Sequence, residues 1–323
     1  MFLVYYIYTM AQRIQIPANF QEILPELKEK TFKWRFEYSS RTELSSVGYI
    51  THFSPVSTRP INGSIILSPG LASNCDTEPL MQAITYWALT KNFNIYTITT
   101  FLGDFKPENS SELAHRHTFP EFINLMEMGL GIIEEQCQNQ WTCLIGHSVG
   151  GLGIIEFLNR RIQANKPLNF SSAILFAPYV THQWLDFSKT FYRERNCPPE
   201  TTDAEFAHTP IGLISPHDVF TSKQVRYISI LPSFYDEMDA VEFRPDLMSK
   251  YQIPVTFVAG GRDKKSPTKM LQERVQTLQS ITGNHQFKLI EFSNSKHSFI
   301  DQHRDYRAVI DLIKTQHVRR RRR

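Results

Sequence analysis

Residues 142–151 have the sequence Thr-Cys-Leu-Ile-Gly-His-Ser-Val-Gly-Gly, which places Ser148 between Gly146 and Gly150. The apolar residues before Gly146 predict a short buried strand, and Leu-Gly-Ile-Ile-Glu-Phe-Leu at 152–158 predicts a helix. A serine at such a turn is held in a strained backbone conformation, with its hydroxyl pushed clear of the sheet. Glycines flank it because a side chain at either position would collide with the tight turn. This stretch therefore predicts a chain organised around Ser148.

The pentapeptide is short enough to arise by chance, so its meaning depends on the elements around it. Short apolar runs predict buried strands, and stretches with helical spacing predict helices between them. The further strands are expected at 64–67, 93–99, 141–145, 172–176, 254–259 and 287–292, and the further helices at 77–91 (with Asp76 as N-cap), 122–137 and 306–315. This alternation predicts an α/β fold: a mostly parallel central sheet with helices on both faces. Strands at 31–38 and 46–53 add an antiparallel hairpin at one edge.

One interval interrupts the alternation of strands and helices. Residues 182–250 are rich in aromatic residues and prolines and contain no confident core strand. A structureless loop of this length is unusual in a compact domain, so we expect a helical cap over the carboxyl edge of the sheet. An ordinary surface subdomain is the alternative. The expected organisation is a lead-in at 1–30, a core at 31–181 and 251–318, a cap at 182–250, and a basic tail at 319–323.

A serine hydroxyl is a poor nucleophile until a base removes its proton, so Ser148 predicts a histidine and an acid elsewhere. The strand expected at 254–259 runs into Gly-Gly-Arg-Asp, which ends at Asp263. The next strand is followed by a loop that contains His297. Ligands bind parallel sheets at the carboxyl ends of their strands, where both residues lie. The order along the chain is then Ser148, Asp263, His297.

Three features together resemble the α/β-hydrolase fold enzymes: the Gly-x-Ser-x-Gly turn around Ser148, the Gly-Gly-Arg-Asp motif that ends at Asp263, and the late His297. The resemblance covers roughly residues 45–315. The insertion before the acid strand is similar to that of the capped lysophospholipase and monoacylglycerol-lipase-like branch, which includes serine peptidase relatives. The resemblance implies that Ser148 is the nucleophile of a nucleophile elbow. It further implies that His297 is the general base and then the general acid, and that Asp263 orients His297 and stabilises its imidazolium.

The family also uses two backbone N–H groups as an oxyanion hole, and the resemblance implies Val149 and Leu71 for them. Two loops depart from the family pattern. Pro69-Gly70 replaces the common His-Gly pair before Leu71, and Phe-Leu-Gly-Asp-Phe at 101–105 replaces the usual Asp-x-Arg-Gly-x-Gly loop.

The other histidines and acids are given other roles. His147 is interpreted as a packing neighbour of the turn, without a catalytic role. Surface or cap positions, and no zinc binding, are expected for His115, His117, His182 and His217; Asp218 and Asp301 are the alternative acids. No metal and no organic cofactor is implied.

Composition limits the class of partner. The chain has 323 residues, 41% of them hydrophobic, and a formal charge of +3. Five of the positive charges are Arg319–Arg323, and removing them from +3 leaves −2 for the body of the chain. A near-neutral body predicts no nucleic-acid binding. The arginine tail predicts a solvated end, or a weak contact with anionic membrane lipids.

Cysteines and targeting signals indicate the compartment. Cys75, Cys137, Cys143 and Cys197 show no metal spacing and are expected to be reduced thiols. No segment reaches the roughly 18–20 apolar residues that a membrane span requires. Residues 2–8 are apolar and precede a loose cleavage-like site at 9–11, so export is an alternative, as is a natural start at Met10. We expect a soluble, cytoplasmic protein.

The residues favour a serine hydrolase that cleaves a carboxylic ester, with an acyl ester or lipid as substrate, since an aromatic cap suits an apolar acyl pocket. A nucleophilic serine argues against the dehalogenase and epoxide hydrolase chemistry of capped relatives, which uses aspartate. A peptidase or amidase on the same residues is the first alternative and would need carboxylates in the cap. The acids available there are Glu194, Glu200, Asp203, Glu205, Asp236, Glu237 and Asp239. A catalytically inactive binding protein with the same fold is the second alternative.

Overall fold

A computed structural model gives the fold of the chain. It describes residues 48–55, 59–70, 78–100, 118–138, 140–179, 240–263, 266–283, 286–297 and 309–316, together with Phe234, Glu237, Met238 and Phe299 and the backbone of strands at 5–9, 12–16, 31–39 and 45–47. Most of the cap expected at 182–250, the tail at 319–323 and the loop at 101–117 lie outside the described residues.

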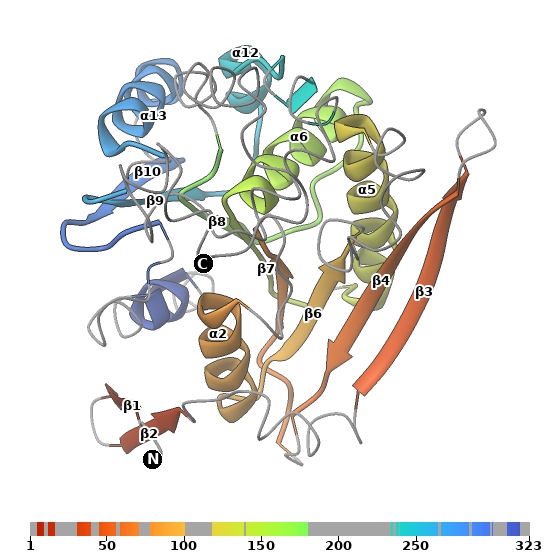
Figure 1. Ribbon diagram of the computed structural model, residues 1–323, viewed down its shortest axis with the longest axis vertical. Coiled ribbons are helices and arrows are strands. Elements are labelled where there is room, and N and C mark those ends of the chain that lie inside the picture. The colour runs from red at the N-terminus through yellow and green to blue at the C-terminus, as the bar shows by residue number, and fades with distance from the viewer. Residues whose placement is uncertain are drawn as a thin grey trace, which may run out of the picture.

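An eight-stranded sheet forms the centre of the molecule, with the strand order β10-β9-β8-β7-β5-β6-β4-β3 (Figure 1). Its strands are β3 (Thr31–Ser39), β4 (Ser45–Phe53), β5 (Ser64–Ser68), β6 (Asn94–Thr99), β7 (Thr142–His147), β8 (Ser172–Phe176), β9 (Val255–Gly260) and β10 (Phe287–Phe292). The strands β5 to β10 are mutually parallel, whereas β4 runs antiparallel to both β6 and β3. The predicted parallel sheet and its antiparallel edge hairpin are therefore confirmed.

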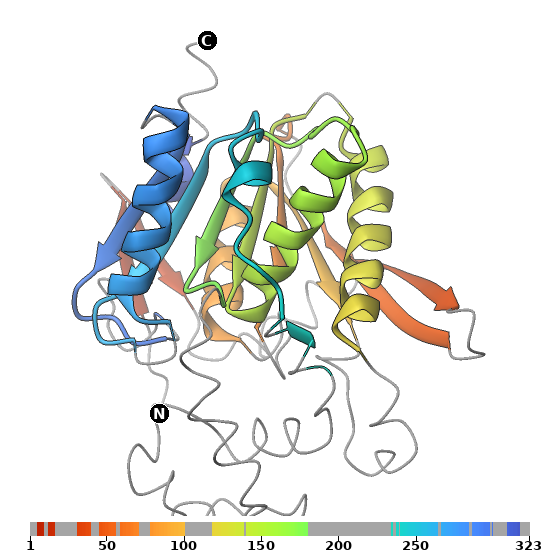
Figure 2. The ribbon, with the colours of Figure 1, turned by 90° about the horizontal axis from the view of Figure 1, so that it is seen from above.

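Helices cover both faces of this sheet (Figures 1 and 2). They are α2 (Pro79–Thr90), α5 (Phe119–Gln136), α6 (Val149–Gln163), α12 (Pro245–Met248), α13 (Thr268–Thr282) and the helical residues 309–316. One apolar core lies between the sheet and α5, α6, α12 and α13, and the other lies between the sheet and α2 with residues 309–316. Phe257 is fully buried in the first core, and Trp87 and Ile310 are buried in the second. The prediction of helices on both faces is confirmed.

The structure differs from the prediction in two details, one at the start of α2 and one near the N-terminus. The N-cap of α2 is Glu78, so the prediction of Asp76 was wrong. Proline suits the first helical turn because its fixed φ is already helical and its missing N–H has no acceptor there, and Pro79 therefore sets the start. Within the expected lead-in, β1 (Tyr5–Thr9) and β2 (Gln12–Ile16) form a separate antiparallel hairpin, with β2 beside α2.

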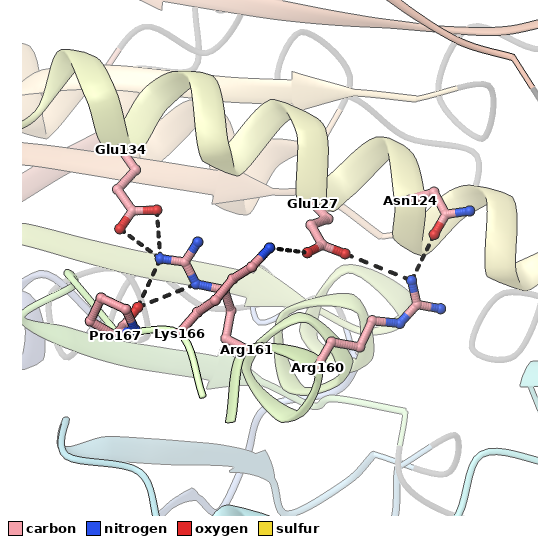
Figure 3. Close-up of polar contacts among 7 residues, drawn as sticks. All are labelled: Asn124, Glu127, Glu134, Arg160, Arg161, Lys166 and Pro167. Carbon is pink, nitrogen blue, oxygen red and sulfur yellow. Dashed lines mark hydrogen bonds and ion pairs between the residues drawn. The ribbon is translucent and has the colours of Figure 1, made fainter. Parts of the chain in front are cut away.

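Helix α6, which follows Ser148, is fastened to α5 by ion pairs (Figure 3). The guanidinium of Arg161 donates to both carboxylate oxygens of Glu134 at 2.8 and 2.9 Å and also to the carbonyl of Pro167. The neighbouring Arg160 donates to Asn124, nearer the N-terminus of α5, at 2.7 Å. Ion pairs open to solvent contribute about 0–1 kcal/mol each. The Arg161–Glu134 pair is only partly buried, so packing in the apolar core supplies most of the stability of this contact. The ion pairs fix the register of α6 against α5.

The two described cysteines, Cys137 and Cys143, are buried free thiols, as predicted. Burial raises the pKa of Cys143 to about 12, so its thiol stays protonated. Cys75 and Cys197 lie outside the described residues. Among the helices that the structure describes, none is long and apolar enough to cross a membrane.

Candidate active site

Ser148 lies at the turn between β7 and α6, as the sequence predicts. Its backbone has φ 51° and ψ −121°, a conformation that non-glycine residues rarely adopt. Backbone hydrogen bonds hold it there: the Ser148 N–H donates to the carbonyl of Phe176 at 2.9 Å, and the Ser148 carbonyl accepts from Gly151 at 3.0 Å, Tyr179 at 3.1 Å and Leu152 at 3.2 Å. Such a conformation costs about 1–3 kcal/mol and persists only where the surroundings impose it. The serine is half-buried, and the turn holds it in place.

The glycine that follows Val149 allows the neighbouring loop to approach the turn. A Cβ atom on Gly150 would lie 2.2 Å from the carbonyl oxygen of Ser68 and 2.4 Å from that of Pro69. Real Cβ atoms do not approach backbone this closely, so only glycine fits. The loop after β5 therefore packs directly against the start of α6. This contact brings together the two segments from which the oxyanion donors were predicted.

Asp263 and His297 are in direct contact. Nδ1 of His297 lies 2.8 Å from Oδ2 of Asp263, whose side chain is fully buried, while the His297 side chain is 14% exposed. The other carboxylate oxygen accepts from the Ser266 N–H at 3.0 Å. Because an aspartate accepts only, Nδ1 of His297 carries the proton, and Nε2 of a neutral ring is left with a lone pair. His297 thus has the tautomer that a general base requires.

The loops that carry these two residues are tied to each other. The Gly261 N–H donates to the carbonyl of Phe292, and the Arg262 N–H donates to that of Ser295. A Cβ atom on Gly260 would lie 2.6 Å from the same Ser295 carbonyl oxygen, so the glycine permits this approach. The Gly-Gly-Arg-Asp motif therefore joins the loop after β9 to the loop after β10.

His147 connects His297 to the turn. Its ring lies 4.9 Å from the ring of His297, centroid to centroid, and its Nε2 lies 2.8 Å from the His297 carbonyl oxygen. Because His147 directly precedes Ser148, these contacts join the loop of the predicted base to the turn that carries the predicted nucleophile. The predicted packing role of His147 is only part of its function here, since both ring nitrogens make polar contacts.

A further residue of the site was missed by the sequence analysis. Glu78 is buried, and its Oε1 lies 2.6 Å from Nδ1 of His147. Its Oε2 accepts from the Gly70 N–H at 2.8 Å. No motif marks a glutamate before a helical proline, and Glu78 lies 69 positions before His147, so only the fold shows the contact.

The structure describes one of the two predicted oxyanion donors. Val149 is the first residue of α6, where helix geometry leaves the N–H without an acceptor inside the helix. Leu71 lies outside the described residues, which reach Gly70. The N–H of Gly70 points to Glu78 and is used there.

Several other predicted residues cannot be placed. His115, His117, His182, His217, Asp218 and Asp301 lie outside the described residues, as do all the cap acids except Glu237. Glu237 accepts from the Phe119 N–H at 2.8 Å and so caps the N-terminus of α5. In the described part of the chain, no group of three or more His, Cys, Asp or Glu side chains could hold a metal ion.

Comparison with known proteins gives matches of fold. Neither protein-family models nor curated proteins match the sequence. A structure from work on carboxylesterases of the thaumarchaeon Nitrososphaera gargenis has a TM-score of 0.57 at 13% identity, covering 87% of this chain and 98% of that one. Est1E of Butyrivibrio proteoclasticus has a TM-score of 0.54 at 11% identity, with coverage of 87% and 98%. An esterase of Pyrococcus furiosus has a TM-score of 0.52 at 12% identity, with coverage of 91% and 90%.

The TM-scores of 0.52–0.57 establish a shared fold. At 11–13% identity the fold does not establish the activity, which depends on the residues of the site. The chain has the α/β-hydrolase fold, with its eight strands in the order given above.

Proposed function

We propose that this α/β-hydrolase-fold chain is a serine hydrolase that cleaves a carboxylic ester through an acyl-enzyme on Ser148. The observation that carries the proposal is the Asp263–His297 pair, 2.8 Å apart, with His297 in contact with His147, the residue before the strained Ser148. A nucleophile, a base and a residue that orients the base are the parts that acyl transfer needs. The esterases and carboxylesterases among the structures of similar fold support the same chemistry.

In the proposed first step, Oγ of Ser148 attacks the ester carbonyl carbon while Nε2 of His297 takes the hydroxyl proton. Asp263 holds the ring and stabilises the imidazolium that forms. The carbonyl oxygen becomes an oxyanion, which the Val149 N–H and a donor from the loop after Gly70 stabilise. As the carbon–oxygen bond breaks, His297 gives its proton to the leaving alcohol.

In the second step, water completes the reaction. His297 takes a proton from a water molecule, whose oxygen attacks the acyl carbon of the ester on Ser148. The second tetrahedral species collapses, the bond to Oγ breaks, and His297 returns the proton to Ser148. The products are a carboxylic acid and an alcohol, and the enzyme regains its starting state.

The proposed substrate is an ester of a fatty acyl chain, such as a lysophospholipid or a monoacylglycerol. Support comes from the aromatic composition of residues 182–250. Apolar surroundings of this kind suit an acyl chain. A weak contact of the tail Arg319–Arg323 with anionic lipid, about 1 kcal/mol per charge, would aid such an enzyme.

A panel of p-nitrophenyl esters from acetate to palmitate, measured beside aminoacyl anilides, tests the proposal. We expect ester turnover that increases with chain length and little or no anilide cleavage. Anilide cleavage without ester turnover would replace the proposal with a peptidase. A folded protein that turns over neither class and does not react with a fluorophosphonate would be a binding protein.

A further inference from the structure

A second pair of ionisable side chains is buried beside the proposed catalytic residues. Glu78 and His147 are each 7% exposed, and Oε1 of Glu78 lies 2.6 Å from Nδ1 of His147. At this distance the carboxylate of Glu78 and the imidazole of His147 are in direct polar contact. A buried charge is costly unless it is paired, so each of the two side chains depends on the other.

Each member of the pair also contacts the backbone of one loop of the site. Oε2 of Glu78 accepts from the Gly70 N–H at 2.8 Å, directly before Leu71. Nε2 of His147 lies 2.8 Å from the carbonyl oxygen of His297. A carbonyl only accepts, so Nε2 of His147 carries a proton. The pair thus links the loop after β5 to the loop after β10.

The charge of His147 follows from its surroundings. Burial by itself would lower the pKa of His147, but the negative charge of Glu78, the contacts of the ring with Glu78 and with the His297 carbonyl, and the more distant Asp263 outweigh it. The pKa of His147 is therefore raised above its ordinary value near 6.5. Both ring nitrogens face acceptors, Oε1 of Glu78 and the His297 carbonyl oxygen, so the geometry favours an imidazolium paired with a carboxylate.

We propose that Glu78 and His147 are positioning residues that hold the backbone of Gly70 and of His297 in place around Ser148. This inference rests on the proposed hydrolase function. Neither side chain is assigned a contact with the reacting atoms, so both act through the loops. Displacing a catalytic group by about 1 Å can cost roughly 10²-fold in rate, so removing the pair is expected to lower kcat more than it changes KM.

The shape of the glutamate and its charge can be tested separately. In Glu78→Ala both contacts of the carboxylate are lost, and we expect kcat to fall roughly 10–100-fold with KM within about threefold of wild type. Glu78→Gln keeps the shape and an oxygen for the Gly70 N–H but removes the charge, so kcat is expected to fall less. Without that charge the buried His147 ring is neutral, and a positive charge beside the His297 ring disappears. The acid limb of the kcat/KM profile is therefore expected to move to higher pH in Glu78→Gln.

A variant elsewhere controls for a general loss of stability. Glu134→Ala also removes a carboxylate from a partly buried ion pair, with Arg161, but on the α5–α6 contact. We expect it to lower the melting temperature and to leave kcat and the acid limb unchanged. If Glu78→Ala does not fold, Glu78→Gln decides. An unchanged kcat together with an unchanged acid limb in Glu78→Gln would overturn the proposal.

Nuclear magnetic resonance of 15N-labelled histidine reports the protonation of the two ring nitrogens of His147 and does not depend on turnover. In the Ser148→Ala background at pH 7 we expect His147, assigned through His147→Phe, to have protons on both ring nitrogens and to lose one in Glu78→Gln. A neutral His147 in the folded protein would overturn the proposal. Ester turnover that persists in Ser148→Ala would instead contradict the proposed function, so the two failures are distinguishable.

Discussion

Nδ1 of His297 and Oδ2 of Asp263 lie 2.8 Å apart, although the residues are 34 positions apart in the chain and belong to loops after different strands. The contact exists because β9 and β10 are parallel neighbours whose last residues, Gly260 and Phe292, are paired in register. Both loops therefore leave the sheet at the same edge. The bond between two side chains is thus a consequence of strand order.

Replacing the aspartate by its amide tests the orienting role directly. Asp263→Asn preserves the size of the side chain and an acceptor for the Ser266 N–H. Its amide group would donate to Nδ1 of His297 and favour the wrong tautomer. We expect kcat to fall roughly 10³–10⁴-fold with little change in melting temperature. Kinetics of a p-nitrophenyl ester measure the loss; activity within tenfold of wild type would rule out the assigned role.

Backbone strain at Ser148 predicts a difference between two inactive variants. Ser148→Ala keeps a Cβ atom at φ 51°, whereas Ser148→Gly removes it. The strain costs about 1–3 kcal/mol, and the greater freedom of glycine in the unfolded chain offsets about 0.4–1 kcal/mol of the gain. The glycine variant should be more stable by about 1 kcal/mol, as measured by urea unfolding. Equal stabilities would argue that the turn is unstrained.

The close approach at Gly150 predicts a loss of activity from the smallest possible side chain. In Gly150→Ala the new methyl group would force the Ser68 and Pro69 carbonyls away from the turn. We expect ester turnover to fall at least tenfold as the loop after β5 moves. Gly131→Ala is the matched control, because, apart from the backbone of α5 itself, no atom of the described residues lies within 4 Å of its new Cβ. That control should be more stable by about 0.5–1 kcal/mol and fully active; equal effects of the two changes would contradict the account.

The buried Glu78–His147 pair predicts how stability depends on pH. Because the folded pKa of His147 is raised above its unfolded value near 6.5, its stabilising contribution is complete below about pH 6.5 and is lost as pH rises through the folded pKa. The free energy of unfolding of wild type minus that of Glu78→Gln should therefore shrink above pH 6.5. Urea unfolding from pH 5.5 to 9.5 measures this difference. A difference that grows with pH would mean that His147 is neutral.

Much of this arrangement could be predicted from the sequence because parallel strands confine functional residues to one edge of the sheet. The strand at 287–292 was predicted to the residue, and the glycines that flank Ser148 indicated a tight turn that the structure contains. Ser148, Asp263 and His297 follow from those strand ends. Their catalytic roles remain proposals.

Other features depend on contacts that leave no local pattern. Glu78 was missed because its partners, Gly70 and His147, meet it only after α2 packs on the sheet. The N-cap of α2 was misplaced because a side-chain preference for Asp76 was weighed above the backbone preference of Pro79. Helix α13 was not predicted, since only Leu271, Val275 and Leu278 of its residues are buried and its apolar stripe is narrow.

The central claim is that Ser148 is an activated nucleophile. Its most direct test is reaction with a fluorophosphonate, followed by mass spectrometry of the proteolytic peptides. We predict a single adduct on Ser148, formed at least 10³-fold more slowly in Asp263→Asn and absent in Ser148→Ala. An adduct on another residue, or no adduct on a folded wild-type protein that hydrolyses esters, would contradict the account.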